Sequence, residues 1–296
     1  MNKRDFLKFL GTASVAAPVA AITSALVSPY PNSIRKEEAA VERILRTGII
    51  RAGYIIYEPA FTKDPNTNQL SGFVFDLAEK IAANLKLRIE WVEEVSFGTA
   101  LSGLETGRYD FVASPFWPNA IRARLADFCQ PIFYSAIGVF VQQNDNRFND
   151  LERINDPTVR ISTIDGEMAA MLASERFPNA AQFSLPQSAD ISLMLLNVVL
   201  GKADVAITEV ALANQFIKKN PGKLKNIAAY RPLQVFPNVF PVKRSETGLQ
   251  NMINVALEEL LNSGYVDQLL DAAEPNKGDY YRVALPYRTP QAVFAD

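Results

Sequence analysis

Apolar side chains follow two periods along the chain, and the two periods alternate. Residues 36–47 carry apolar positions at helical spacing, and residues 49–57 follow as an apolar, β-branched stretch typical of a strand. The pattern then predicts strands at 87–91, 109–113, 159–164 and 205–208, and helices at 73–85, 97–105, 168–175, 189–200 and 210–219. Alternating strands and helices predict an α/β fold whose sheets are covered by helices.

The remaining segments have other patterns. Residues 62–71 are rich in polar and turn-forming residues, so we expect a loop there. Pro118 suits the first turn of a further helix. Residues 233–242 place prolines among apolar residues, which indicates an extended segment that returns across the molecule. Two helices are expected near the C-terminus, at 249–261 and 265–273.

A short feature occurs twice, at 104–110 and at 200–204. Each copy ends an apolar helix at a glycine, continues through a basic residue and reaches an aspartate in front of an apolar strand. The glycine suits a left-handed helix cap. The repetition indicates two α/β lobes built alike, unless the two segments are independent examples of a common helix-to-strand turn.

The composition excludes several classes of chemistry. The 296 residues suit two domains or one large one, and 30 basic against 32 acidic residues argue against a nucleic-acid binder or a polybasic membrane binder. The absence of histidine excludes Ser-His-Asp and Cys-His catalysis and histidine-ligated zinc. Cys129 is the single cysteine, so neither an intramolecular disulfide nor a cysteine-cluster metal site can form. We expect Cys129 to be buried and unreactive.

The N-terminus has the layout of an export signal. Lys3, Arg4 and Lys8 precede an Ala/Val-rich stretch, and the first residues resemble the twin-arginine motif with lysine in place of the first arginine. Both the twin-arginine route and general secretion are open. We expect residues 1–28 to be a signal peptide, with a membrane anchor or an amphipathic helix as the alternative, and a soluble periplasmic protein after cleavage.

Five sequence motifs occur along the chain in the same order as in a known protein family. They are 72–78 (GFVFDLA), 101–110 (LSGLETGRYD), 122–134 (an RxxxxDF followed by PIFY), 200–209 (LGKADVAITE) and the helix at 249–261 with the Gly-Tyr that follows it. Together they resemble the bacterial extracellular solute-binding proteins of family 3, the receptors of polar amino-acid ABC importers. The resemblance covers residues 40 to 273.

The resemblance implies a type II periplasmic-binding-protein fold, in which two α/β lobes are joined by two extended hinge strands. The ligand would lie in the cleft between the lobes and be enclosed by hinge closure. Lobe 1 would comprise residues 36–136 and 235–285, and lobe 2 residues 137–234. Residues 286–296 would form a surface tail.

The resemblance also implies two charged ligand contacts. Arg122 matches the family's arginine that forms a two-pronged salt bridge with the ligand's α-carboxylate, a geometry that suits the planar guanidinium. Arg124 is expected to be a solvated surface residue. Glu209 matches the acidic residue that receives the α-amino group, although most relatives carry aspartate. The alternatives are a surface arginine for Arg122 and, for Glu209, a helix N-terminal residue favoured by the dipole.

The first lobe departs from the family pattern in its binding residues. Where relatives usually have small Ser or Thr residues before the arginine, this chain has Ser114, two prolines and the bulky Trp117. Tyr57 and Glu58 stand near the family's aromatic platform. An aromatic face with a carboxylate beside it favours a cation.

The second lobe departs as well. The family's Gly-Thr turn, whose threonine grips the carboxylate, is Gly166-Glu167 here. A glutamate at that point would repel a carboxylate and attract a cation. We therefore expect a ligand with an anionic end for Arg122 and a cationic portion near Glu167 and Glu209.

The function implied is amino-acid transport. A monomeric receptor would capture a small charged, amino-acid-like solute without covalent chemistry or a cofactor, and present it to an ABC permease in the cytoplasmic membrane. Two alternatives remain open. Some relatives are exported cyclohexadienyl dehydratases, for which Glu167 or Glu209 would serve as the general acid. A ligand-sensing subunit of a membrane signalling receptor would have the same cleft and a different partner.

Overall fold

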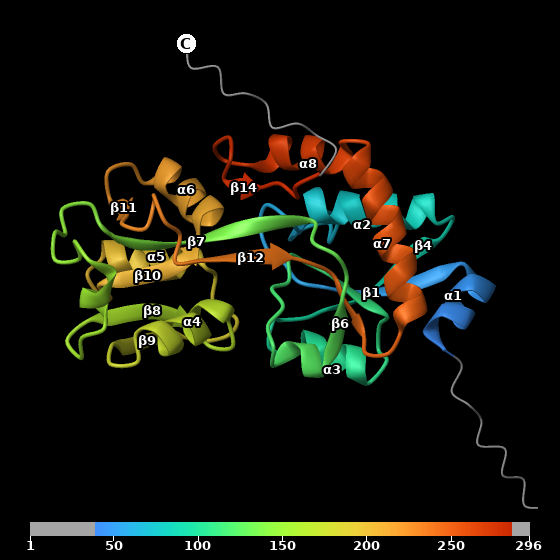
Figure 1. The fold of residues 1–296 in the computed structure, drawn as a ribbon, viewed down its shortest axis with the longest axis horizontal. Coiled ribbons are helices and arrows are strands. Elements are labelled where there is room, and N and C mark those ends of the chain that lie inside the picture. Colours follow the sequence, from blue (N-terminus) through green and yellow to red (C-terminus); the bar gives the residue numbers. More distant parts are fainter. Residues whose placement is uncertain (1–38, 286–296) are drawn as a thin grey trace, which may run out of the picture. The chain divides into compact units, whose positions relative to one another are not determined.

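The computed structural model describes residues 39–285 (Figure 1), so the predicted signal peptide and tail lie outside the described residues. The helices are α1 (Ala40–Thr47), α2 (Phe73–Asn84), α3 (Ala100–Glu105), α4 (Met168–Arg176), α5 (Ser192–Val199), α6 (Val210–Lys219), α7 (Thr247–Asn262) and α8 (Tyr265–Ala273), with 3-10 turns η1 (Arg122–Arg124) and η2 (Leu151–Ile154). Within residues 39–285, none of these helices combines the length and the apolar content that a bilayer crossing requires.

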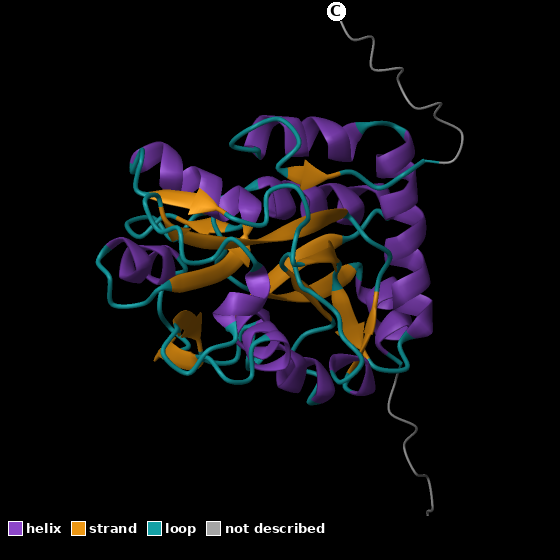
Figure 2. Cartoon of the chain, turned by 60° about the vertical axis from the view of Figure 1, so that its left-hand side comes forward, coloured by secondary structure: helices purple, strands orange, loops and turns teal. Residues whose placement is uncertain are grey.

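The strands fall into two large sheets and a small hairpin, and Figure 2 shows the strands flanked by helices. They are β1 (Ile49–Tyr54), β2 (Thr62–Lys63), β3 (Leu70–Ser71), β4 (Arg88–Glu94), β5 (Phe111–Ala113), β6 (Ala126–Phe128), β7 (Phe133–Gln142), β8 (Arg160–Ile164), β9 (Ala181–Leu185), β10 (Val205–Glu209), β11 (Leu224–Asn226), β12 (Gln234–Asn238), β13 (Pro241–Lys243) and β14 (Tyr280–Tyr281). The hairpin of β2 and β3 lies in the segment expected to be a loop.

The first sheet has five strands in the order β4-β1-β5-β13-β6. β1 pairs in parallel with β4 and β5, whereas β13 pairs antiparallel with β5 and β6. Helix α2 buries Phe73, Leu77 and Ile81, which recur at the spacing of one helix face. These side chains share a core with Leu257 and Leu260 of α7. The sheet is therefore covered by helices from both ends of the described chain.

The second sheet has the order β11-β7-β10-β8-β9, and β12 and β14 also pair with β7. β8 is parallel to β9 and β10, and β7 is antiparallel to its partners. Alternate residues of β10 enter two separate cores, with Val205 and Ile207 in one and Ala206 in the other. Both faces of this sheet are thus buried, which agrees with the predicted α/β pattern.

The chain passes between the two sheets along two extended segments. One leads from β6 through residues 129–132 into β7, and the other leads from β12 into β13. Residues 133–137 of β7 pair antiparallel with residues 234–238 of β12, and Figure 1 shows the two strands side by side. The predicted arrangement of two α/β parts joined by two extended strands is confirmed, while the residues at which the lobes begin and end stay a prediction.

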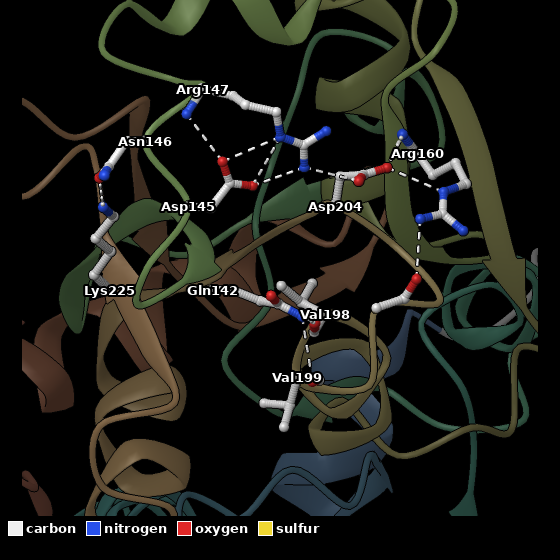
Figure 3. Close-up of polar contacts among 10 residues, drawn as sticks. Gln142, Asp145, Asn146, Arg147, Arg160, Val198, Val199, Asp204 and Lys225 are labelled. Atoms are coloured by element: carbon white, nitrogen blue, oxygen red, sulfur yellow. Dashed lines mark hydrogen bonds and ion pairs between the residues drawn. The ribbon is translucent and has the colours of Figure 1, made fainter.

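The repeated glycine–basic–aspartate feature forms the same structure in both copies. Asp110, directly before β5, accepts the backbone N–H of Arg51 at 2.8 Å and an Nη of its guanidinium at 2.9 Å. Asp204, directly before β10, accepts the backbone N–H of Arg160 at 2.9 Å and its Nε at 3.0 Å, as Figure 3 shows. Each aspartate N–H donates back to the carbonyl of the same arginine, at 2.9 and 2.8 Å. The matching contacts support two α/β units built alike.

Two sequence expectations have different outcomes. The helix expected from Pro118 is wrong: the segment contains only the turn η1, where the Arg122 N–H bonds to the Asn119 side chain instead of entering a longer helix. Cys129 is buried, as expected, and burial raises the pKa of its thiol to about 12, so the thiol is protonated at neutral pH.

Candidate functional site

A cavity of about 780 Å³ lies between segments from the two sheets. On one side it is lined by residues 55–58, which follow β1, and by residues 94–97, which begin at the last residue of β4. On the other side it is lined by Asp165, Glu167 and residues 187–192, which follow β8 and β9, together with side chains of α6. Carboxyl ends of strands are where α/β sheets place ligand sites. The volume falls within the range of small-molecule sites, about 300–1,000 Å³.

The wall of this cavity is acidic. It carries the carboxylates of Glu58, Glu94, Asp165, Glu167 and Asp190, and the single basic residue among the lining residues is Lys219. Glu94 forms an ion pair with Lys63 at 2.9 Å, outside the lining, and both side chains are accessible to solvent. Such a pair is screened and contributes little. The wall therefore attracts positive charge.

Arg122 lies beside this cavity. It lines a second cavity of about 20 Å³, here called the extension because Tyr57 and Phe97 line both it and the main cavity. Its Nη1 donates to the backbone oxygen of Trp117 at 2.8 Å, and the guanidinium carbon lies 4.6 Å from the ring centre of Phe116. Burial lowers the pKa of Arg122. Within residues 39–285 its guanidinium forms no ion pair, so its other N–H groups can receive an anionic ligand group.

Glu167 belongs to both the cavity and the extension. It is the N-cap residue of α4, but its side chain makes no capping hydrogen bond. Burial raises the pKa of Glu167 to about 7; the charge of Arg122 opposes this shift, and the charge of Asp190 adds to it. At neutral pH the carboxyl group is therefore divided between its acid and its ionised form.

Glu209, the last residue of β10, lies behind Tyr57 and is not part of either cavity wall. It is 2% exposed and lines neither of them. The Tyr57 hydroxyl donates to one of its carboxylate oxygens at 2.7 Å, and the Ser135 hydroxyl donates to the other. Burial raises the pKa of Glu209, while these two hydrogen bonds oppose the rise. Both carboxylate oxygens of Glu209 thus already accept a hydrogen bond from a hydroxyl group of the protein.

Ser114 and Trp117 lie in the segment that departs from the expected pattern. Ser114 is fully buried, lines neither cavity, and its hydroxyl has no hydrogen-bond partner in the described part of the chain. Trp117 lines the extension, stacks on Phe236 with ring centres 5.0 Å apart, and donates its indole N–H to Asn238 at 2.8 Å. These contacts attach Trp117 to β12.

The structure brings five of the seven predicted site residues to the cavity and its extension: Tyr57, Glu58, Trp117, Arg122 and Glu167. Ser114 and Glu209 line neither space. Contact with a ligand stays a prediction for all seven.

Sequence reasoning missed several lining residues. Asp165 directly follows β8, and Asp190 precedes α5, where it accepts the backbone N–H of Ser192 at 2.7 Å. The rule that ligands bind beyond the carboxyl ends of parallel strands could have found Asp165 from the predicted strand at 159–164. Phe97 meets the Tyr57 ring edge-on at 5.8 Å. It gives no such signal, because an isolated aromatic residue before a helix usually belongs to a core.

Most of the described chain matches the model of one protein family. The model of the bacterial extracellular solute-binding proteins, family 3, matches residues 50–272. The chain belongs to this family. Among the proteins similar to it, a probable amino-acid ABC transporter-binding protein of Haemophilus influenzae is 22% identical over 77% of this chain and 85% of its own length. The L-arginine-binding protein of Pseudomonas aeruginosa is 25% identical over 78% of this chain and 88% of its own length.

The fold of this family 3 protein is also similar to those of solved structures. An ancestral amino-acid-binding protein, described as a precursor of cyclohexadienyl dehydratase, superposes on this chain with a TM-score of 0.70 at 24% identity, covering 80% of this chain and 99% of its own. The predicted type II periplasmic-binding-protein fold is thereby confirmed.

Proposed function

We propose that this protein is the periplasmic receptor of an ABC importer and that it captures a small cationic amino acid or a close derivative. The solute would lie in the 780 Å³ cavity and be enclosed when the parts carrying the two sheets close by hinge motion. A monomer without a cofactor would suffice, because capture forms and breaks no covalent bond. The bound form would then be presented to a permease in the cytoplasmic membrane.

The acidic wall of the cavity carries this proposal. Five lining carboxylates, one of them paired with Lys63, outnumber the single lining lysine and favour a cation over a neutral or acidic solute. The Pseudomonas aeruginosa relative is an L-arginine-binding protein, which agrees with that charge. Membership of family 3 supports the receptor role and the export of the protein.

The roles of individual residues follow from chemistry. Arg122 would hold the α-carboxylate with paired N–H groups, since its guanidinium forms no ion pair within residues 39–285. Glu167, which lines the space beside Arg122, would receive the α-ammonium group. Asp165 and Asp190 would face the second positive group of the solute. The Tyr57 ring would offer an aromatic face to that cation.

Isothermal titration against a solute panel tests the proposal. We expect L-arginine or L-lysine to bind at least about a hundredfold more tightly than L-glutamate, because the side-chain carboxylate of L-glutamate would meet like charges in this wall. Putrescine and an opine extend the panel to cations without an α-carboxylate and to amino-acid conjugates. Tight binding of L-glutamate would contradict the proposal.

Glu167 gives the affinity a pH dependence with a definite sign. A cation beside Glu167 favours its ionised form, so binding releases a proton wherever the pKa of about 7 leaves the group protonated. The affinity for L-arginine is expected to fall about tenfold from pH 8 to pH 6. Titrations in buffers of different ionisation enthalpy measure the proton release directly.

The Glu167→Gln variant is the control for this pH dependence. It should bind L-arginine more weakly at pH 8 and show a flat profile between pH 6 and pH 8, because the titrating group is gone. In the solute-free wild type, the free energy of unfolding should decrease as the pH rises from about 4.5 to about 7, since the unfolded chain loses this proton first. A wild-type affinity that is constant with pH would exclude this role for Glu167.

A second candidate function is supported by the same residue. A carboxylic acid that is half protonated at pH 7 can act as a general acid, as a dehydratase requires. The structural neighbour described as a precursor of cyclohexadienyl dehydratase shares this fold. Loss of prephenate or arogenate absorbance on adding the protein would favour the enzyme, and an unchanged spectrum would favour the receptor.

A further inference from the structure

A chain of buried and partly buried hydrogen bonds runs through both connecting strands and ends on Glu209. The Trp117 indole donates to Asn238 at 2.8 Å, and the Asn238 amide donates to the Ser135 hydroxyl at 2.7 Å. Ser135 in turn donates to Glu209, and Tyr57 donates to the other Glu209 oxygen at 2.7 Å. Asn238 and Ser135 are fully buried, and Glu209 is 2% exposed. Every donor in the series is thus directed toward one carboxylate.

These bonds join parts of the chain that are far apart in sequence. Ser135 lies in β7 and Asn238 in β12, the two strands that connect the sheets. Glu209 ends β10 of the second sheet, whereas Tyr57 follows β1 of the first. The Tyr57–Glu209 hydrogen bond therefore directly links the part of the protein that carries the first sheet to the part that carries the second. Tyr57 also forms part of the cavity wall, so this link lies next to the candidate solute site.

We propose that Glu209 is a positioning residue for closure, which holds the two α/β parts together through Tyr57 instead of contacting the solute. Its carboxylate lines neither cavity, and each of its oxygens already accepts a hydroxyl group. Glutamate is one methylene longer than aspartate, and this length lets the carboxylate reach the Tyr57 hydroxyl. This inference shares one assumption with the proposed receptor function, namely that the protein captures its solute by closing.

The link biases the protein toward its closed form before solute arrives. Opening would separate Tyr57 from Glu209 and leave a buried carboxylate with one donor fewer, which is unfavourable. The loss of one hydrogen bond is enough to change an open-to-closed ratio by about tenfold. Because apparent affinity scales with the fraction of binding-competent protein, losing the link should also weaken solute binding, by at most the same factor.

Distance measurements on the solute-free full chain test this proposal. Nitroxide labels are placed on Glu105→Cys in α3, which packs with the first sheet, and on Glu175→Cys in α4, which packs with the second. Both positions are exposed, and the buried Cys129 stays unlabelled. Double electron–electron resonance then reports open and closed populations. Tyr57→Phe and Glu209→Gln are each expected to raise the open-to-closed ratio about tenfold.

Tyr109→Phe is the matched control. It deletes a buried phenol hydroxyl that donates to the Ala100 carbonyl at 2.7 Å, a bond within the first sheet's side alone. We expect it to lower the melting temperature and to leave the distance distribution unchanged. If Glu209→Gln does not fold, Tyr57→Phe decides by itself, since it keeps the aromatic ring.

Two outcomes would overturn the proposal: Tyr57→Phe with the wild-type distance distribution, or a wild type without a closed population when solute is absent. Titrating the labelled proteins with L-arginine separates this result from the proposed function. If L-arginine neither binds nor shortens the distance in the wild type, the cationic-amino-acid proposal fails. The solute-free comparison of Tyr57→Phe with Tyr109→Phe still decides the role of Glu209.

Discussion

Replacing Arg122 with alanine is expected to weaken the binding of L-arginine by at least about a hundredfold. The variant removes the paired N–H donors proposed for the α-carboxylate and leaves that carboxylate next to Glu167, a like charge. Truncating one partner of a buried, hydrogen-bonded charge pair costs about 2–5 kcal/mol, which is the basis for this magnitude. Isothermal titration at pH 8, where Glu167 is ionised, measures the loss.

Two further variants show whether this loss is specific. Arg124→Ala removes an exposed guanidinium two residues away and should bind like the wild type. Arg122→Lys keeps the charge but not the planar fork, so its affinity should lie between those of the wild type and the alanine variant. Equal affinities for Arg122→Ala and the wild type would remove Arg122 from the site.

Replacing Asp110 with alanine is expected to destabilise the fold by about 3 kcal/mol. The carboxylate is 2% exposed and accepts the backbone N–H of Arg51 together with the guanidinium groups of Arg51 and Arg43. Its loss leaves these partly buried donors without their acceptor at the point where β1 and β5 pair. A decrease of about 8 °C in melting temperature should accompany it, because a domain of this size loses about 2–4 °C per kcal/mol.

The second copy of the same feature supplies the control. Asp204 makes equivalent contacts with Arg160 and also pairs with Arg147, as Figure 3 shows. Its side chain is 12% exposed, and the arginine side chains are 45% and 56% exposed. Solvent screening weakens such pairs, so Asp204→Ala should cost about 1 kcal/mol. A larger loss for Asp204→Ala than for Asp110→Ala would show that burial does not set the contribution of this feature.

Much of the fold could be predicted from the sequence because its central elements carry strong periodic signals. Helix α2 buries one regular face, and β10 is an apolar stretch between helices. β7 was missed because nearly every residue in it is buried, so apolar and polar positions do not alternate. β9 was missed for the opposite reason: it is an edge strand exposed at four of its five positions.

The candidate site was harder to predict, because it is formed by side chains whose neighbours come from other segments. Resemblance to the family indicated Arg122 and Glu167, and both lie at the cavity or its extension. The same resemblance could not show that Glu209 turns toward Tyr57 and Ser135. That orientation depends on contacts between strands far apart in the sequence, which no local pattern records.

The position of β13 has a consequence for how the protein is made. This strand stands between β5 and β6 in the first sheet, although its residues follow β12 in the chain. While the ribosome is still adding residues before Pro241, the sheet begun by β1 has a gap that nothing else fills. The sheet whose first strand is synthesised earliest is therefore complete only after β13 has been added. A stop codon that removes the C-terminal segment from β13 onward should unfold the N-terminal sheet, which is remote in sequence from the truncation.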